Sequence, residues 1–263
     1  MTKQEFDTLY QNGDYEALAS YRADNAVIMA AGLSSRFAPL SDSVPKALLR
    51  VKGEILIERQ IRQIYEAGIP RIYLVVGYKK EMFAYLAEKY HVQLLENPEY
   101  RTRNNNSSIY AARHILGNSY ICSADNYFME NVFEPYIYQS YYAASYAAGP
   151  TEEYCLITDR TGKITDVQIG GADSWYMMGH VYWNREFSRK FTEILEAEYT
   201  LPETAPLYWE NIYMKHIDAL PLYIRKYPEG TIREFDNLKE LCQFDPSYIP
   251  YLDTLSKQQR ETP

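Results

Sequence analysis

Residues 30–36, with the sequence Ala-Ala-Gly-Leu-Ser-Ser-Arg, could bind the phosphate groups of a nucleotide. Small residues after an apolar run let backbone N–H groups approach an anion closely. Arg36 and Lys46, which follows Pro45, would add two positive side chains to the same anion. A loop of small residues after a strand is, by itself, more often a tight turn without a ligand. Together with the arginine and the Pro-Lys pair at this spacing, it indicates a triphosphate site.

Asp125 and Asp236 are candidates for a metal site beside that triphosphate. Asp125 follows a predicted strand, and Asp236 lies in a predicted strand-to-helix segment over residues 232–241. Carboxylate oxygens suit Mg²⁺, which offsets phosphate charge and orients an α-phosphate for in-line attack. The two aspartates lie far apart in the sequence, and an aspartate at a strand end is ordinarily a cap or a turn former, so spacing alone does not pair them.

Strands and helices that alternate along the first half of the chain would position these groups. Apolar runs predict strands and helical stripes lie between them, with strands at 26–30, 71–76, 92–95 and 119–123 and helices at 54–67, 81–90 and 107–116. This alternation predicts a parallel sheet with right-handed crossovers. In such a sheet, ligands bind beyond the carboxyl ends of the strands.

The second half of the chain is richer in strand-like stretches. We predict strands at 142–148, 155–159, 163–169, 178–183 and 222–226, and helices at 185–199 and 207–216. Thr161-Gly162 marks a hairpin turn. Ahead of the first strand, Thr2 and Glu5 have capping-box spacing, and a second short helical pattern follows over residues 14–21. The second half should extend the sheet and close one side of the ligand cleft.

The composition restricts the partners of the protein. A net charge of -8 and a pI of about 5.2 argue against a nucleic-acid partner. Three widely spaced cysteines suggest neither a disulfide framework nor a zinc cluster, and no signal peptide or membrane span is evident, so we expect a cytoplasmic protein with no membrane partner. The four histidines have no metal-ligand or hydrolase arrangement.

The phosphate-binding segment and the Pro-Lys-x-Leu sequence at 45–48 resemble the motif Ala-Ala-Gly-x-Gly-[Ser/Thr]-Arg followed by Pro-Lys-x-Leu of a nucleotidyltransferase family. Ser34 stands where that motif has its second glycine. More narrowly, residues 25–241 resemble the bacterial CTP:phosphocholine cytidylyltransferases, in the segments 76–78, 104–105, 124–127, 207–209 and 234–236. Residues 1–22 lie outside the resemblance.

The resemblance implies an α/β fold with a Rossmann-like mixed, mostly parallel sheet flanked by helices, as in the nucleotide-diphospho-sugar transferases. It implies a nucleotidyltransferase domain over residues 25–263, and the helical patterns ahead of this domain predict a small N-terminal helical extension over residues 1–24. The nucleotide-binding half would span residues 25–137 and the acceptor-binding half residues 138–263.

The resemblance also implies a reaction, in which CTP and phosphocholine give CDP-choline and pyrophosphate with Mg²⁺ held by Asp125 and Asp236. Arg36 and Lys46 would stabilise the transferring phosphate and the leaving pyrophosphate. The acceptor phosphate is already a nucleophile at neutral pH, so positioning and charge stabilisation should dominate and no general base is assigned.

Further residues are implied for the two substrates. Those expected to line the nucleotide pocket are Met29, Ala31, Gly32, Leu33, Ser34, Ser35, Arg103, Asn104, Asn105, Ser108 and Ala124. A quaternary ammonium would be held by ring faces and a carboxylate, and the residues expected to bind it are Tyr154, Tyr208, Trp209, Glu210 and Glu234, with Trp175, Tyr182 and Trp183 as additional candidates. A Tyr-Trp pair at the start of an amphipathic helix could equally well pack onto the sheet.

Two alternatives to this function stay open. The same chemistry could act on a sugar 1-phosphate, phosphoethanolamine or an aminoalkylphosphonate, and no residue dictates CTP over UTP by chemistry alone. A regulatory protein that binds a nucleotide without turnover is a different class, but retention of both aspartates and both basic residues argues against it. The sequence leaves the oligomeric state open between a monomer and a homodimer.

Overall fold

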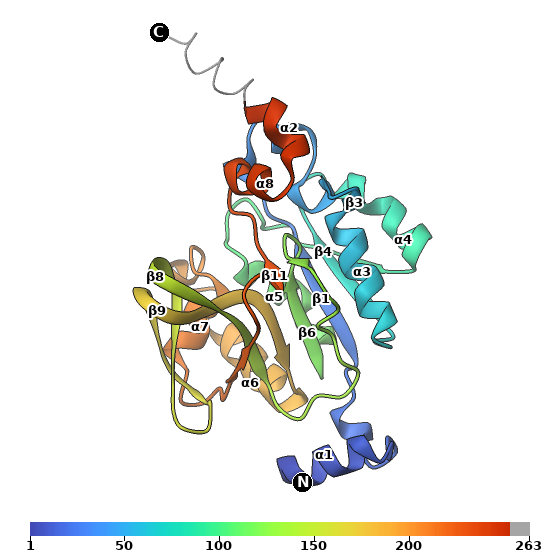
Figure 1. Cartoon of the computed structure of the whole chain (residues 1–263), viewed down its shortest axis with the longest axis vertical. Coiled ribbons are helices and arrows are strands. Elements are labelled where there is room, and N and C mark those ends of the chain that lie inside the picture. The colour runs from blue at the N-terminus through green and yellow to red at the C-terminus, as the bar shows by residue number, and fades with distance from the viewer. Residues whose placement is uncertain (253–263) are drawn as a thin grey trace.

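The computed structural model describes residues 1–252, and its centre is a seven-stranded sheet (Figure 1). The strand order is β10-β8-β9-β6-β1-β4-β5. The bounds of these strands are β1 (Asn25–Ala30), β4 (Ile72–Val76), β5 (Gln93–Glu96), β6 (Ser119–Ser123), β8 (Tyr141–Thr158), β9 (Ile164–Trp183) and β10 (Tyr223–Lys226). Strand β9 is antiparallel to both of its neighbours and the other adjacent pairs are parallel, which confirms the predicted mixed, mostly parallel sheet.

Helices cover both faces of this sheet. Their bounds are α1 (Lys3–Gln11), α2 (Leu40–Ser43), α3 (Leu56–Glu66), α4 (Ala84–Tyr90), α5 (Asn106–Ala112), α6 (Arg185–Glu198), α7 (Trp209–Lys215) and α8 (Leu238–Phe244). One core joins the apolar side of α3 to the sheet, and a second core joins α5, α6 and α7 to the opposite face. Two small sheets, β2 (Arg50–Val51) with β3 (Glu54–Ile55) and β7 (Tyr127–Phe128) with β11 (Ile232–Arg233), lie outside the main one.

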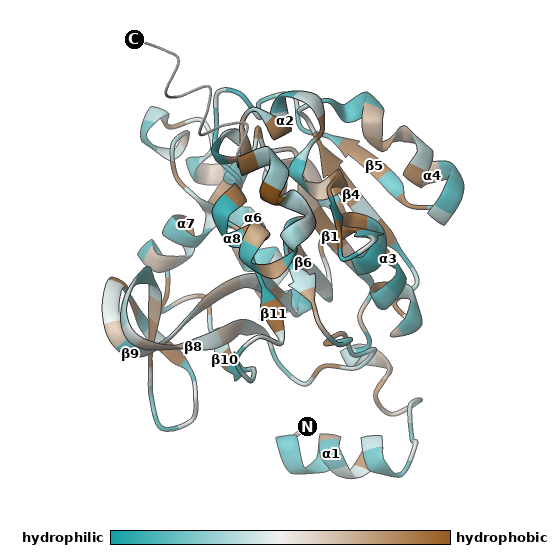
Figure 2. Ribbon diagram, turned by 45° about the horizontal axis from the view of Figure 1, so that its top comes forward, coloured by the Kyte–Doolittle hydropathy of each residue, from teal (hydrophilic) through white to brown (hydrophobic). Residues whose placement is uncertain are grey.

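The position of β1 between two cores explains why residues 26–30 form a continuous apolar run. Ala26 and Ile28 pack into the core beside α3, whereas Val27 packs into the core beside α5. All three are completely buried, because alternate side chains of a strand point to opposite faces and both faces are covered. Figure 2 shows brown, hydrophobic colouring concentrated on the central strands.

Strands β8 and β9 differ from the prediction, because two long strands of 18 and 20 residues replace four short ones. The apparent breaks in the sequence are glycine and proline positions, including Gly149, Pro150 and Gly170. The pairing crosses these positions through register shifts, so the two strands bend without separating. The predicted turn at Thr161-Gly162 is confirmed, with the Asp159 carboxylate accepting the Thr161 N–H at 2.8 Å.

The N-terminal residues form the predicted α1 with its capping box at Thr2, and this helix lies apart from the main sheet (Figure 1). Phe6 contacts the rings of Tyr21 and Tyr138. The predicted helix over residues 14–21 is wrong, since only a 3₁₀ turn at Ala19–Tyr21 forms there.

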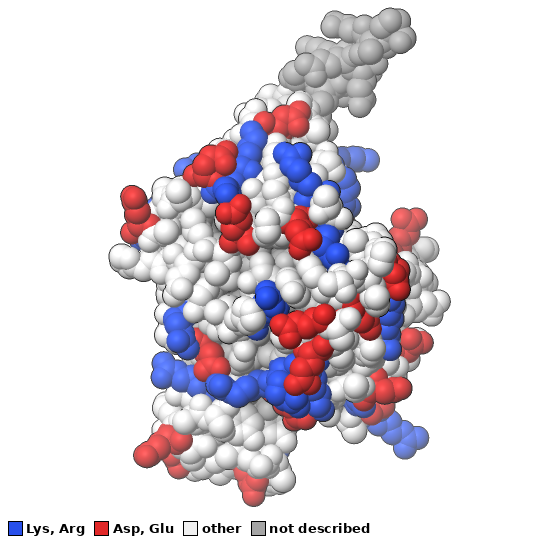
Figure 3. All heavy atoms as spheres, turned by 180° about the vertical axis from the view of Figure 1, so that it is seen from behind, with Lys and Arg blue, Asp and Glu red and all other residues white. Residues whose placement is uncertain are grey.

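None of the helices within residues 1–252 has the length and apolar character of a membrane span. On the face shown in Figure 3, Lys and Arg side chains are interleaved with Asp and Glu over most of the surface.

Gly77 lies where β4 ends and contacts the loop after β5. A Cβ atom at Gly77 would lie 2.8 Å from the Tyr100 ring, closer than real Cβ contacts allow. The next residue, Tyr78, donates its N–H to the Ala31 carbonyl at 3.1 Å. This hydrogen bond ties the end of β4 to the turn after β1. Only glycine therefore permits the close approach of these loops.

We predict that Gly77→Ala displaces Tyr100 and lowers the free energy of unfolding by about 1–3 kcal/mol, as overpacking of a filled site does. Urea denaturation followed by circular dichroism measures this change. Gly32→Ala is the matched control, because a Cβ atom at Gly32 meets no atom within 4 Å and its φ, like that of Gly77, lies outside the left-handed region. A G77A protein as stable as the wild type would contradict the packing argument.

Candidate active site

A cleft of about 710 Å³ opens beyond the carboxyl ends of the central strands. It is bounded by the segments that follow β1, β5 and β6, together with residues from the loop before α7 and the segment after β11. The predicted residues that line it are Met29, Ala31, Gly32, Leu33, Ser34, Ser35, Arg36, Lys46, Arg103, Asn104, Asn105, Ser108, Ala124, Asp125, Tyr208, Glu234 and Asp236. The structure therefore brings most of the predicted site residues to one cavity.

The turn after β1 follows the edge of this cleft. Ser34 has a φ of +52°, in the left-handed region that glycine adopts freely. A serine in this conformation costs roughly 1 kcal/mol, because its Cβ approaches the following carbonyl oxygen. Ser34 stands where the broad motif has its second glycine. The backbone there keeps a conformation suited to glycine, although the residue is a serine.

The two predicted basic residues each contact one predicted aspartate. The Lys46 ammonium lies 2.7 Å from an Asp125 carboxylate oxygen, and the Lys46 side chain is only 8% exposed. It also lies 4.7 Å from the centre of the Phe37 ring. Arg36 is 2.8 Å from Asp236, but its side chain is 69% exposed and is therefore freer to move. Both cation–carboxylate pairs line the cleft.

The small sheet formed by β7 and β11 explains how the distant aspartates meet. Asp125 lies two residues before β7, and Asp236 lies three residues after β11. The two strands pair antiparallel, with Phe128 opposite Ile232. The carboxylates therefore converge through backbone pairing that no spacing in the sequence reveals.

A third carboxyl group, that of Glu234, directly follows β11 and precedes Asp236 by two residues. Burial and the negative charges of Asp125 and Asp236 raise the pKa of the Glu234 carboxyl to about 8, although Lys46 opposes the shift. Glu234 therefore stays largely protonated at neutral pH, while Asp125 and Asp236 are each ion-paired with a basic side chain.

This donor set fits a divalent cation of the hard, oxygen-binding kind. Carboxylates converge at the cleft, and a cation there would lower the cost of their mutual repulsion. Within residues 1–252, no three carboxylate, imidazole or thiol side chains form a complete protein-only metal site. Asp125 and Asp236 would therefore share the ion with phosphate oxygens of a nucleotide, which is how Mg²⁺ is commonly held.

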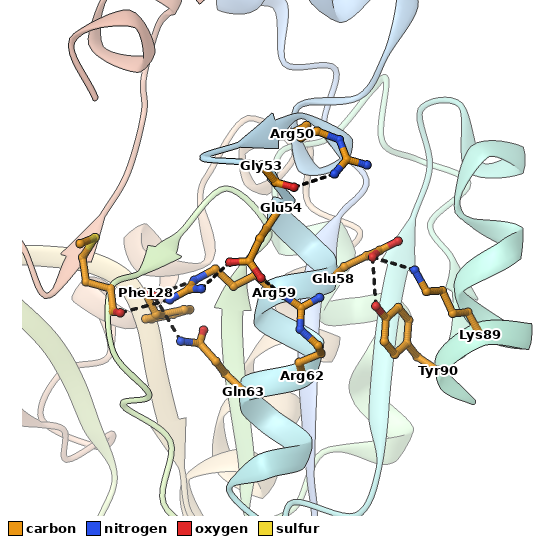
Figure 4. A network of polar contacts seen from close by, with 11 residues as sticks. Arg50, Gly53, Glu54, Glu58, Arg59, Arg62, Gln63, Lys89, Tyr90 and Phe128 are labelled. Atoms are coloured by element: carbon orange, nitrogen blue, oxygen red, sulfur yellow. Dashed lines mark hydrogen bonds and ion pairs between the residues drawn. The ribbon is translucent and has the colours of Figure 1, made fainter. Parts of the chain in front are cut away.

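The network in Figure 4 holds the segment that carries Asp125 against helix α3. Arg59 donates from Nε to the Phe128 carbonyl at 3.0 Å and from Nη2 to the Met129 carbonyl at 3.1 Å. Gln63 donates to the same Phe128 carbonyl at 3.2 Å. Glu54 fixes Arg59 from the other side through a 2.5 Å ion pair. Helix α3 thus positions β7 without contacting the cleft itself.

Of the predicted acceptor-binding aromatic residues, Tyr208 alone lines the cleft, with 45% of its surface exposed. Trp209 is 1% exposed and packs in the core against Tyr142, with ring centres 5.7 Å apart. The two neighbours diverge because helix α7 begins between them. Tyr154 lies on β8, where its hydroxyl accepts a hydrogen bond from Asn211 at 3.3 Å.

The additional aromatic candidates also lie outside the cleft lining. Tyr182 and Trp183 are completely buried in the two cores. Trp175 is partly exposed, but the Lys226 ammonium lies 4.8 Å from its ring centre. One face of Trp175 is therefore already occupied by a cation.

Glu210 lies behind the cleft wall. Its carboxylate accepts the Tyr142 hydroxyl at 3.1 Å and the Asn105 amide at 3.3 Å. The Asn105 amide oxygen in turn accepts the Trp209 N–H at 2.7 Å. Burial raises the pKa of Glu210 to about 7, and these two hydrogen bonds oppose the shift. Glu210 thus connects helix α7 to Asn105, which lines the cleft.

Several cleft residues were missed by sequence reasoning, and they are Phe37, Asn97, Tyr100, Arg101, Thr102, Ser107, Ser123, Ala205 and Pro206. Asn97 directly follows β5. The rule that ligands bind beyond strand ends could have identified it. Ala205 and Pro206 had no comparable signal, because their loop reaches the cleft through hydrogen bonds from Asn104 and Asn106.

Comparisons with known proteins place the chain among nucleotidyltransferases. Residues 26–161 match the family model described as the MobA-like NTP transferase domain. The chain is 38% identical to the 2-aminoethylphosphonate cytidylyltransferase of Lancefieldella rimae, covering 86% of this chain and 93% of that protein. It is 34% identical to the choline-phosphate cytidylyltransferase of Streptococcus pneumoniae, covering 82% and 94%. A solved structure of the CTP:phosphocholine cytidylyltransferase from Streptococcus pneumoniae matches with a TM-score of 0.82 over 86% of this chain and 98% of that one.

We predict that Arg59→Ala lowers turnover about tenfold or more, because the segment carrying Asp125 loses two hydrogen bonds from α3. Arg62→Ala is the matched control, since Arg62 lies on the same helix and pairs with the same Glu54. Steady-state rates of pyrophosphate release, compared with melting temperatures, separate positioning from folding. Equal losses of turnover in the two variants would refute the role given to Arg59.

We predict that Glu210→Gln removes a pH dependence of stability. The folded-state pKa of about 7 lies above the ordinary value of 4.5, so the wild type binds an extra proton when folded and loses stability as the pH rises through 7. Glutamine keeps a hydrogen-bonding side chain and does not ionise. The wild-type melting temperature should therefore fall by several degrees more than that of E210Q between pH 5.5 and 8.5.

Glu203→Gln, on the exposed loop before α7, is the control for loss of one carboxylate. If the melting temperatures of wild type and E210Q fall equally between pH 5.5 and 8.5, the Glu210 carboxylate does not cause the pH dependence of stability.

Proposed function

Because the chain belongs to the family of MobA-like NTP transferase domains, we propose that it transfers a cytidylyl group from CTP to phosphocholine and releases pyrophosphate. The observation that carries the proposal is the pair of cation–carboxylate contacts, Lys46 with Asp125 and Arg36 with Asp236, in one cleft with the phosphate-binding turn. The relatives named for cytidylyl transfer support CTP as the donor.

The reaction needs positioning and charge stabilisation more than covalent help. An oxygen of the acceptor phosphate forms a bond to the α-phosphorus of CTP, and the bond from that phosphorus to the bridging oxygen breaks. The electron pair leaves with pyrophosphate. Lys46, buried at the cleft wall, offers a fixed positive charge to the α-phosphate, and the more mobile Arg36 can follow the leaving pyrophosphate.

The proposed cofactor is Mg²⁺, held by Asp125 and Asp236. When bound, the ion would offset the charge of the triphosphate and polarise the α-phosphate toward attack. The protein groups keep their own tasks, since the turn at residues 31–35 supplies backbone N–H groups at the cleft edge.

A second acceptor is favoured by the composition of the cleft wall. A trimethylammonium group is held chiefly by ring faces. Of the rings that line the cleft, Phe37 and Tyr100 already lie against Lys46 and Arg101, which leaves Tyr208. Glu234 lines the cleft as well, and a primary ammonium can donate hydrogen bonds to such a carboxylate. The second candidate is therefore 2-aminoethylphosphonate, whose transferase from Lancefieldella rimae is among the relatives.

The experiment that tests the proposal measures pyrophosphate release from CTP or UTP with phosphocholine, 2-aminoethylphosphonate or glucose 1-phosphate. We predict turnover with CTP and an ammonium-bearing acceptor in Mg²⁺, and loss of turnover in excess chelator. Asp125→Asn should lower kcat at least a hundredfold, because it removes a charged oxygen donor at the proposed metal site.

The ratio of kcat/KM for the two ammonium acceptors decides between them. A ratio above ten in favour of phosphocholine supports the first candidate, and the reverse ratio supports the second. Turnover only with glucose 1-phosphate would overturn both, and the absence of turnover with every acceptor would support a regulatory nucleotide-binding protein instead.

A further inference from the structure

Four side chains form a continuous stack that ends at the cleft. The rings of Tyr110 and Tyr199 lie face to face, with centres 3.6 Å apart and planes 8° from parallel. The guanidinium carbon of Arg113 lies 3.9 Å from the centre of the Tyr110 ring, and that of Arg103 lies 3.8 Å from the Tyr199 ring. Since the tyrosines cover each other's inner faces, the guanidinium groups cover the outer ones.

The outer end of the stack is fixed to α6. Arg113 donates from Nε to the Glu196 carboxylate at 3.0 Å and from Nη1 to the Tyr110 carbonyl at 2.7 Å. Tyr110 belongs to α5, and Tyr199 directly follows α6. The stack is therefore anchored on two helices rather than on a loop.

The inner end of the stack is tied to the loop that lines the cleft. The Tyr199 hydroxyl donates to the Glu99 carboxylate. The backbone carbonyl of Glu99 accepts the Arg103 N–H at 2.9 Å, and Arg103 Nε donates to the Asn106 amide oxygen at 3.3 Å. Ring, carboxylate and backbone thus form a closed set of contacts around Arg103.

Arg103 differs from the two basic residues assigned to the phosphates. Arg36 and Lys46 are both ion-paired with carboxylates. Within the described part of the chain, Arg103 forms no ion pair, and its Nη2 atom is buried without a hydrogen-bond partner. An unpaired buried donor is costly, so an acceptor atom brought by a ligand would improve the environment of this guanidinium.

We propose that Tyr199 is a positioning residue for nucleotide binding, because its ring fixes the plane of the Arg103 guanidinium at the cleft wall. A guanidinium has a planar set of donors, and its orientation decides which acceptor atoms it can meet. Without the ring, Arg103 would sample several rotamers, and binding would have to order it. This inference rests on the proposed function only in taking a nucleotide as the ligand.

The test measures nucleotide affinity by isothermal titration calorimetry in Mg²⁺. CTP, UTP, ATP and GTP are first titrated into the wild-type protein, and the tightest of them is the probe. We expect Tyr199→Leu to raise its Kd about tenfold, or about 1.4 kcal/mol. Tyr199→Phe, which keeps the ring, should restore affinity to within about threefold of the wild type.

Two further variants distinguish positioning from general destabilisation. Tyr90→Leu removes a partly buried tyrosine that does not line the cleft, and its Kd should equal that of the wild type. In an Arg103→Ala background, Tyr199→Leu should cause no further loss, because the group that it positions is gone.

The inference is overturned if Tyr199→Leu lowers the affinity equally in the wild-type and Arg103→Ala backgrounds. It is also overturned if the single variant Tyr199→Leu leaves the Kd unchanged. The outcome is separable from that of the proposed function. A wild-type protein that binds a nucleotide but transfers it to no acceptor would contradict the function and leave this test of Tyr199 intact.

Discussion

The pairing of β7 with β11 is the contact on which the site depends. It joins two residues on each side, yet it places Asp125 and Asp236 at one edge of the cleft. Both aspartates raise the pKa of the neighbouring Glu234, so these carboxyl groups do not hold the arrangement themselves. Backbone hydrogen bonds, the Arg59 contacts to the Phe128 and Met129 carbonyls and the Lys46–Asp125 ion pair hold it instead. Such enforced proximity of like charges is typical of sites that bind a cation.

The first half of the fold was predictable because its signals are local. The run at residues 26–30 is apolar at every position, as a strand covered on both faces must be. The turn at residues 30–36 and Lys46 are close in sequence, so their residue types and spacing indicated one site. The convergence of Asp125 with Asp236 was expected only from family resemblance, because the pairing that produces it joins distant parts of the chain.

The location of the predicted acceptor-binding residues was less predictable, because two neighbouring residues there lie in different environments. Tyr208 and Trp209 are adjacent and both aromatic, but one is at the cleft and the other is in the core. No local pattern distinguishes them, because the direction of each side chain depends on where helix α7 begins. The Arg103–Tyr199 contact is equally hidden, since its members come from separate elements and neither has a characteristic motif.

The long hairpin of β8 and β9 has two parts, a base within the main sheet and an outer part that reaches toward the cleft carboxyl groups. Its base belongs to the main sheet, where β9 pairs with β6, whereas Glu153 farther along β8 is close enough to Glu234 to raise its pKa. Although no residue of the hairpin lines the cleft, a change of charge at Glu153 would therefore alter the protonation of a cleft carboxyl without disturbing the parallel core. The hairpin thus lets evolution tune the electrostatics of the cleft from a distance, on a part of the chain whose replacement leaves the strands beneath the cleft unchanged.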